Sequence, residues 1–461
     1  PTVTLPGDAP AATPDAATPA AATPTLRPTT TPATTPGATP ETDPATVRVA
    51  AAPLPPISRD ALLIGDGALK LWRTAGQLTT LLPGANAAPG ERTAAQRPLI
   101  GDVVLVATAE NSRQLVAARV TGSDASDDTL PQTVALLALS PDGGTPRLVA
   151  DGIPGIRELA LAPDGRHVAV IAQTAVAPLA DAAFQVQVFQ VDSGVQRLAA
   201  PCSSACAGLA WHPDNQNVAW ADPETAVWLF NLGSSEPQRL LENQGGPQNV
   251  DISIPVSWAQ NGRFLLLRHS AFLEGSESRV LDVVTGQTAV VPDSFYYVEP
   301  HVPQVVWMAD SRLLVSRPRT DGETLATPAL EIWRLQPEAG ELVLEAQDVL
   351  PLPPAGITAP VHLADGRFGF AIYAAADPDS VGLYVLKGID DTLTRANALW
   401  PANSAGDLHV SWNPDGSGAL VQIQGELLYA PTGGDALYAV TPAAGQLTGV
   451  VHWLPLRPPN S

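Results

Sequence analysis

Short apolar segments separated by tight turns recur along most of this chain. In each copy, one apolar segment ends at Trp or Leu, a turn follows, and a second apolar segment begins. The turns contain Pro, which fixes φ, Asp and Asn, which hydrogen-bond the backbone downstream, and Gly, which accepts positive φ. Each copy therefore predicts a β-hairpin. The copies are LAPDGRHVAV (161–170), WHPDNQNVAW (211–220), WAQNGRFLLL (258–267), WMADSRLLVS (307–316), LADGRFGFAI (363–372), WNPDGSGALV (412–421) and a degenerate TAENSRQLVA (108–117).

The copies are evenly spaced along the chain. Successive copies begin 47 to 56 residues apart. A third strand follows several of the hairpins, as in VQVFQV (186–191), and a fourth often follows a Gly-containing turn, as in VTGQTAVV (284–291). A period of about fifty residues with four strands in each period is typical of a β-propeller, in which every period forms one blade.

The two ends of the repeating region complement each other. Residues 60–82 supply the second, third and fourth strands of a blade without a first strand, whereas residues 450–456 match the first-strand pattern. We expect the last strand to complete the first blade, with Trp453 close to Leu63. This arrangement closes the ring and removes both sheet edges.

The predicted fold class is therefore all-β, with four-stranded antiparallel blades in one propeller domain at residues 57–461. Eight blades fit residues 57–456 at about fifty residues each. Seven blades are the alternative if the weakly patterned region 99–150 is an insertion.

The first fifty residues differ in composition from the rest. They hold 11 Pro, 14 Thr and 12 Ala and no aromatic residue. Such a segment cannot bury enough apolar surface to offset its ordering entropy, and its Ala-Thr-Pro repeats favour an extended polyproline-like backbone. We predict that residues 1–56 are a disordered tail, either a plain linker or a stalk whose Thr hydroxyls are open to glycosylation. Both alternatives favour an extracytoplasmic protein that is secreted, periplasmic or anchored at the cell surface.

The charge balance excludes one class of partner. The 461 residues include 25 Lys and Arg against 46 Asp and Glu, which gives a net charge of −21 at pH 7. A field of this sign repels phosphate backbones, so nucleic acid is not expected as a partner. No apolar run approaches the ~20 residues that span a bilayer, so no transmembrane segment is expected in this chain. Because no signal peptide precedes Pro1, we expect the numbering to begin after a cleaved signal, after a removed anchor or at the boundary of a chosen segment.

The Trp/Leu-x-Pro-Asp-Gly hairpins resemble the TolB-type, WD-like propeller repeats of bacterial secreted and periplasmic proteins. The resemblance covers most of residues 57–456, although the Trp-Asp dipeptide that ends a true WD repeat is absent. It implies the propeller fold and a binding scaffold, and it implies no particular chemistry, because this fold carries many functions.

Motifs for catalysis are missing from the sequence. It contains no G-x-S-x-G nucleophile elbow, no P-loop and no haem-attachment motif. No two of the seven His residues stand at ligand spacing, so neither a metal site nor a cofactor is expected. The Trp residues that recur at one position of the copies are expected to pack between neighbouring blades instead of forming a ligand cage.

Cys202 and Cys206 are the two cysteines of the chain. In an oxidising compartment they can form a disulfide that closes a small loop. Free thiols are one alternative. A metal or redox role is another, although the Cys-x-x-Cys spacing typical of that role is absent.

Loop lengths favour one face of the ring as the binding face. The turns between first and second strands are minimal, but several second-to-third connections and several connections into first strands are long. In a propeller these two kinds of loop emerge on the same face, around the mouth of the axial channel, where we expect recognition. We call this the long-loop face and the opposite one the short-turn face.

The candidate binding residues on the long-loop face combine aromatic and charged side chains, which suit protein or carbohydrate contacts. For Phe295 and Tyr297, the alternative is that they only pack their loop against its blade. The candidates are Phe295, Tyr296, Tyr297, Glu299 and His301 of SFYYVEPH (294–301), Arg317 and Arg319 of RPRTDGE (317–323), Asp251 and Asp407.

These observations favour a surface-tethered, non-catalytic scaffold that binds a protein or a glycan at the cell envelope. One alternative is a propeller enzyme, such as a glycan lyase, hydrolase or cyclotransferase, with a carboxylate pair at the channel mouth. Glu158, Asp251, Glu299 and Asp407 are the first acids to test for that role. The other alternative is a structural subunit of a larger envelope complex.

Overall fold

A computed structural model of the chain describes most of the repeating region. The chain divides into a unit of residues 1–43 and a unit of residues 44–461, and all described residues belong to the second unit. The described residues are 49–50, 55–74, 76–85, 101–121, 133–175, 183–203, 206–245, 250–271, 275–292, 294–295, 304–317, 329–338, 341–353, 355–373, 375, 377–389, 393, 395–397, 408–423, 426–434, 436–440 and 452–455. Residues 1–48 of the predicted tail therefore lie outside the described part.

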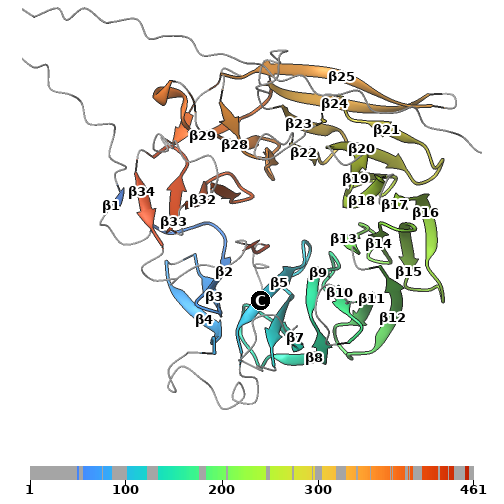
Figure 1. The fold of residues 1–461 in the computed structure, drawn as a ribbon. Coiled ribbons are helices and arrows are strands. Elements are labelled where there is room, and N and C mark those ends of the chain that lie inside the picture. Colours follow the sequence, from blue (N-terminus) through green and yellow to red (C-terminus); the bar gives the residue numbers. More distant parts are fainter. Residues whose placement is uncertain are drawn as a thin grey trace, which may run out of the picture. The chain divides into compact units, whose positions relative to one another are not determined.

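Within the described residues, the strands form eight sheets that follow one another around a central channel (Figure 1). Each sheet is one blade, and neighbouring strands run antiparallel except where β1 (Val49–Ala50) joins the outer edge of the last blade. Blade 1 contains β35 (His452–Trp453), β2 (Ala61–Gly65), β3 (Ala68–Trp72) and β4 (Leu78–Leu82); blade 2 contains β5 (Val103–Thr108), β6 (Leu115–Val120), β7 (Thr133–Leu139) and β8 (Arg147–Pro154). Blade 3 contains β9 (Ile156–Leu161), β10 (His167–Gln173), β11 (Phe184–Gln190) and β12 (Gln196–Cys202); blade 4 contains β13 (Ala207–Trp211), β14 (Asn217–Asp222), β15 (Ala226–Asn231) and β16 (Gln238–Glu242).

The second half of the ring follows the same plan with added strands. Blade 5 contains β17 (Gln244–Gly245), β18 (Val250–Trp258), β19 (Phe264–Ala271), β20 (Ser276–Asp282) and β21 (Thr288–Val290); blade 6 contains β22 (Gln304–Trp307), β23 (Leu313–Arg317), β24 (Ala329–Glu338) and β25 (Glu341–Pro351). Blade 7 contains β26 (Gly356–Ile357), β27 (Val361–His362), β28 (Phe368–Tyr373), the 3-10 helix η3 (Pro378–Ser380), β29 (Gly382–Leu386) and β30 (Arg395–Asn397). Blade 8 contains β31 (His409–Trp412), β32 (Gly418–Ile423), β33 (Glu426–Pro431), β34 (Leu437–Ala439) and β1 (Val49–Ala50).

The prediction of an all-β, eight-bladed propeller is confirmed. The seven-bladed alternative is wrong, because the weakly patterned region 99–150 supplies β5, β6, β7 and half of β8 of a complete blade. The last strand completes the first blade as expected: β35 pairs with β2, with Trp453 opposite Ala61 and His452 opposite Leu62.

The turn residues form the hairpins through the chemistry predicted for them. The Asp164 carboxylate accepts a hydrogen bond from the Arg166 amide at 2.9 Å, which fixes the turn after β9. Gly165 takes a φ of 79° at the next position. In two copies without glycine, Asn215 and Ser311 occupy that position with φ of 63° and 65°, a conformation that costs a non-glycine residue about 1 kcal/mol.

A repeated indole hydrogen bond joins neighbouring blades, so the recurring Trp residues do pack between blades. In each case the indole N–H donates to the main-chain carbonyl that precedes the equivalent Trp or Leu of the blade before it. The pairs are Trp211 with Ala160 at 3.0 Å, and Trp258 with Ala210, Trp307 with Ser257 and Trp453 with Ser411, each at 3.1 Å. Each bond satisfies a carbonyl on the otherwise unpaired inner edge of a sheet.

The core lies between the blades. Leu62 and Leu71 of blade 1 pack with Leu115 of blade 2, and all three are at most 1% exposed. Similar clusters fill the other junctions, so each blade buries its faces against its two neighbours.

Three blades depart from the four-strand plan in ways that the repeats do not signal. In blade 5, the two-residue strand β17 adds a fifth strand, which pairs antiparallel with β18. In blade 8, β1 pairs in parallel with the outermost strand β34, with Val49 opposite Leu437. This strand lies inside the segment that the sequence analysis assigns to the tail. In blade 7, the first strand is split into β26 and β27, both paired with β28. Pro360 lies between the two pieces and has no N–H to donate to a sheet.

The described part of the chain contains no helix that is long and apolar enough to cross a membrane.

Candidate functional site

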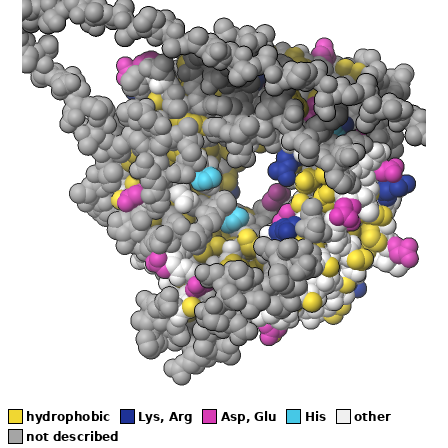
Figure 2. Space-filling model, in the orientation of Figure 1, with side chains coloured by type: hydrophobic (Ala, Val, Ile, Leu, Met, Phe, Trp, Pro, Cys, Tyr) yellow, Lys and Arg dark blue, Asp and Glu magenta, His cyan; other side chains and the backbone are white. Residues whose placement is uncertain are grey.

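A cavity of about 710 Å³ opens in the axial channel at the short-turn end. Its lining comes from the first strands of blades 2 to 7 and from the turns that follow them, and includes Glu110, Trp211, Trp258, Gln260, Trp307 and His362. Figure 2 shows the hollow at the centre of the ring. The Lys or Arg side chains visible around the hollow are not part of this cavity, since no Lys or Arg lines it.

The exposed lining of the cavity is more polar than apolar. Glu110, Asn111 and Gln260 are exposed and carry acceptors and amide donors, and His362 adds an imidazole. The indoles of Trp211 and Trp307 and the side chain of Val256, which is 51% exposed, supply apolar patches. A concave site that combines convergent polar groups with aromatic surface can hold a polar ligand.

Carboxylates in the turns around the cavity stay ionised at neutral pH. Partial burial acts to raise the pKa of Asp214, but hydrogen bonds from the Gln216 amide and the Asn217 side chain outweigh it and hold the pKa below its usual value. Burial also acts to raise the pKa of Asp365, and hydrogen bonds from Arg367 lower it overall. Both carboxylates pair with basic side chains of their own turns, Asp214 with His212 and Asp365 with Arg367. The described lining of the cavity itself holds Glu110 and His362 but no Lys or Arg.

The candidate residues of the long-loop face are only partly described. Tyr296, Tyr297, Glu299, His301, Arg319 and Asp407 lie outside the described residues. Phe295 follows blade 5 and is 41% exposed. Asp251 begins β18 at the same end of the ring, and its side chain is 56% exposed.

Arg317, the remaining candidate, is engaged inside its own blade. Its guanidinium lies 2.6 Å from the carboxylate of Glu331, whose side chain is 3% exposed. Glu331 also accepts a hydrogen bond from the indole of Trp333 at 2.9 Å. This contact fixes Arg317 at the end of β23 and leaves its side chain 21% exposed.

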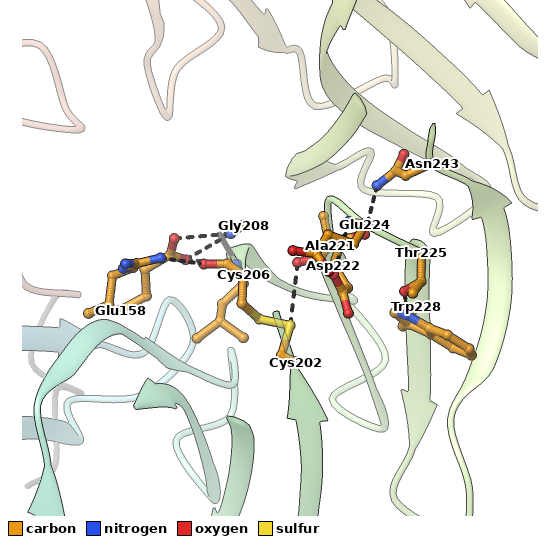
Figure 3. The surroundings of a disulfide bond; sticks show 12 residues. Glu158, Cys202, Cys206, Gly208, Ala221, Asp222, Glu224, Thr225, Trp228 and Asn243 are labelled. Carbon is orange, nitrogen blue, oxygen red and sulfur yellow. Dashed lines mark hydrogen bonds between the residues drawn. A yellow bond between two sulfur atoms is a disulfide. The ribbon is translucent and has the colours of Figure 1, made fainter. Parts of the chain in front are cut away.

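Glu158, an acid considered for catalysis, is a structural link between blades 3 and 4. Its carboxylate accepts hydrogen bonds from the Gly208 and Leu209 amides at 3.0 to 3.1 Å (Figure 3). These amides begin the first strand of blade 4. Because its oxygens already bind two main-chain donors, Glu158 cannot serve as a free proton donor or nucleophile without breaking this junction.

A disulfide joins Cys202, the last residue of β12, to Cys206, which precedes β13 (Figure 3). Cys206 is fully buried, and its carbonyl accepts a hydrogen bond from Arg157 at 3.3 Å. The bond therefore fixes the loop that leads from blade 3 into blade 4, beside the Glu158 link. A ring this short contributes only about 2 kcal/mol through loop closure.

A Ser-His-Asp cluster in blade 5, with Ser253 and His269 buried and Asp251 exposed, escaped the sequence analysis. The Ser253 hydroxyl lies 3.0 Å from Nδ1 of His269, and Asp251 lies 3.5 Å from Nε2. The strand register brings them together, since Ser253 faces His269 across β18 and β19. No sequence motif encodes this pairing of residues sixteen positions apart.

The cluster lacks the arrangement of a hydrolase triad. In a triad the imidazole uses Nε2 to activate the serine and Nδ1 to hold the acid, and here the two contacts are reversed. Ser253 is also only 2% exposed, so a substrate cannot reach its hydroxyl. Asn243 binds the main chain of Ser253 through both of its amide atoms, which marks the cluster as a polar brace within the blade.

The buried imidazole predicts a pH-dependent stability. Burial lowers the pKa of His269, and Arg279 lowers it further, whereas Asp251 and Glu277 act to raise it. The unfolded chain, with a His pKa near 6.5, therefore takes up protons before the folded one does. Stability is expected to be constant above about pH 6.5 and to fall as the pH drops below this value.

Comparing urea unfolding of the wild type with that of His269→Gln between about pH 7.5 and 5.5 tests this expectation. The variant should lose less stability on acidification, because Gln does not titrate. His409→Gln is the matched control, since His409 is exposed on β31 and should leave the pH dependence as it is. An equal acid slope for wild type and His269→Gln would contradict the assignment.

Within the described residues, no three His, Cys, Asp or Glu side chains gather in an arrangement that could hold a metal ion.

The ring of blades around an open channel places the chain in the β-propeller class. No protein-family model and no curated protein matches the sequence. Among solved structures, the dihydro-heme d1 dehydrogenase NirN in complex with DHE is 15% identical, with a TM-score of 0.53 over 89% of this chain and 78% of its own. Dipeptidyl peptidase 4 of Porphyromonas gingivalis is 9% identical, with a TM-score of 0.52 over 83% of this chain and 59% of its own.

The C-terminal WD40 domain of Sif2 is 13% identical, with a TM-score of 0.48 over 84% of this chain and 98% of its own. At identities this low, the likeness shows the fold alone. The first two of these neighbours are a dehydrogenase and a peptidase, so the fold by itself assigns no activity.

Proposed function

We propose that this chain is a non-catalytic binding propeller that acts outside the cytoplasm, tethered by its Thr/Pro-rich N-terminal segment, and that its ligand is a protein or a glycan of the cell envelope. We also propose that the propeller repeats are of the TolB type. The propeller supplies a rigid ring, and binding takes place at the ends of its axial channel.

The observation that carries the proposal is the state of the acids and nucleophiles near the channel. Glu158 is bound by two main-chain amides, and Ser253 is buried with its contacts to His269 reversed from those of a triad. Asp251 is exposed, but its described ionic contact is with the buried imidazole of His269. These contacts support a scaffold over an enzyme, since the groups are used to hold the blades.

Two further observations support an extracytoplasmic location. The Cys202–Cys206 disulfide suits an oxidising compartment, because cytosolic thiols are kept reduced. The Thr/Pro-rich composition of the first fifty residues suits a stalk or a linker.

A turnover assay tests the proposal against its enzymatic alternative. The full chain is incubated with neutral, acidic and amino polysaccharides, and the release of reducing ends and of unsaturated uronates is followed. We expect no turnover by the wild type. Turnover that Asp251→Asn abolishes, while the exposed-site control Glu242→Gln retains it, would overturn the proposal.

A further inference from the structure

The residues that face the cavity occupy one position of the repeat. In most of the hairpins that line the cavity, the third residue of the pattern borders it, and in two of them this residue is proline, Pro163 and Pro213. In blades 2 and 5 the position holds Glu110 and Gln260 instead. This position therefore holds a polar side chain in two of the blades that border the cavity.

The polar side chains at these positions make no described contact within the fold. Gln260 and Glu110 are exposed, and neither side chain makes a described hydrogen bond or ion pair. The Asn111 side chain next to Glu110 is equally free, although its main-chain amide binds Pro163 of the next blade at 2.9 Å. A hairpin gives up the rigidity of proline at these positions, and the polar groups gained remain available to a ligand.

The hydrogen-bonding groups of these three side chains favour a ligand that carries hydroxyl groups over a charged ligand. Each carboxamide both donates and accepts, and the carboxylate accepts, which matches a ligand that offers many hydroxyl groups. An anionic ligand would meet the Glu110 carboxylate without a Lys or Arg in the lining to balance its charge.

The walls suit the apolar C–H faces of sugar rings. The indole N–H groups of Trp211, Trp258 and Trp307 all donate to the preceding blade, so these rings are held in place and contribute only their carbon surfaces. Val256 adds an exposed aliphatic surface in the middle of the channel. A rigid site of about 710 Å³ lies within the ~300–1,000 Å³ of ordinary ligand sites.

We propose that the cavity at the short-turn end of the channel binds a neutral oligosaccharide. The inference rests on the proposed function and names the ligand class and the end of the channel. Glu110, Asn111 and Gln260 bind its hydroxyl groups, and the Trp and Val surfaces contact its ring faces.

Isothermal titration calorimetry of the full chain tests this inference with defined hexasaccharides. The neutral probes are maltohexaose, cellohexaose, mannohexaose and N-acetylchitohexaose, the anionic probe is hexagalacturonate, and the cationic probe is hexaglucosamine. We expect at least one neutral probe to bind and the anionic probe not to bind. Gln260→Ala and Asn111→Ala should each weaken binding roughly tenfold, which corresponds to one lost hydrogen bond.

Gln196→Ala is the matched control, because Gln196 is exposed on the outermost strand of blade 3 and should leave binding as in the wild type. Failure of every neutral probe to bind, or a preference for the cationic or anionic probe, overturns the inference. So does equal binding by the wild type, Gln260→Ala and Asn111→Ala.

The outcomes separate the two proposals. If Phe295→Ser on the long-loop face abolishes binding of a neutral probe and the cavity variants do not, the site lies at the other end, and the binding function stands while this inference falls. Turnover of a probe during the titration would instead overturn the proposed function.

Discussion

Replacing Trp453 with alanine is expected to lower the free energy of unfolding by about 3 kcal/mol and to release the closing strand. β35 is only two residues long, so its attachment depends on few contacts. Trp453 pairs with Ala61 in blade 1, packs against the buried cluster that includes Leu63, and donates its indole N–H to Ser411 of blade 8. Losing the side chain removes the packing and the interblade bond together.

Urea unfolding and limited proteolysis of a C-terminally tagged chain measure this effect. Trp228→Ala is the matched control, because Trp228 is also half-buried but bonds within its own blade, to Thr225. The control should be destabilised less and should keep its C-terminal tag under mild proteolysis. If both variants behave alike, ring closure does not depend on Trp453 in the way we describe.

Replacing Arg113 with alanine is expected to cost about 3–5 kcal/mol, because it leaves a buried carboxylate without its cation. The guanidinium lies 2.6 Å from Asp60, and each side chain is 9% exposed. It also contacts Asp142 of its own blade and donates to the carbonyl of Pro455 at 2.6 Å. Arg113 thus ties blade 2 to blade 1 and to the residues just after the closing strand.

Two comparison variants sharpen this experiment. Arg147→Ala removes an exposed ion pair with Asp192, whose side chains are 42% and 72% exposed, and should cost at most about 1 kcal/mol. Adding Asp60→Asn to Arg113→Ala should recover part of the lost stability, because it removes the unpaired buried charge. Equal losses for Arg113→Ala and Arg147→Ala in urea unfolding would refute the role assigned to Arg113.

The period of the hairpins made the fold predictable, because each turn carries its own conformational signal. Asp164 and Gly165 act locally, so their effect on the chain can be derived from sequence alone. The closing strand was predictable for a similar reason, since the segment around Trp453 matches a first-strand pattern without a blade of its own. The short pairing of Val49 with Leu437 depends on a sheet edge 388 residues away along the chain and has no local signal.

The candidate site was less predictable, because the loop lengths favoured the long-loop face, whereas the cavity lies at the short-turn face. The cavity at the other face is built from single substitutions within the repeat, such as Gln260 at a position where other copies have proline. Comparing the copies with one another, position by position, would have found them. The Ser253–His269 contact could not be found in this way, because it follows from strand register and burial.

The attachment of β1 to the rim of blade 8 has a mechanical consequence. From there the chain continues into β2 of blade 1, and Ser58 on the way bonds to Asn413 and Ser417 of blade 8. Blade 8 therefore holds the N-terminal part of the ring at two described places, at β1 through its pairing with β34 and at Ser58 through these hydrogen bonds. A pull applied at Val49 would have to separate β1 from β34 before it loads the Ser58 contacts and the pairing of β2 with β35.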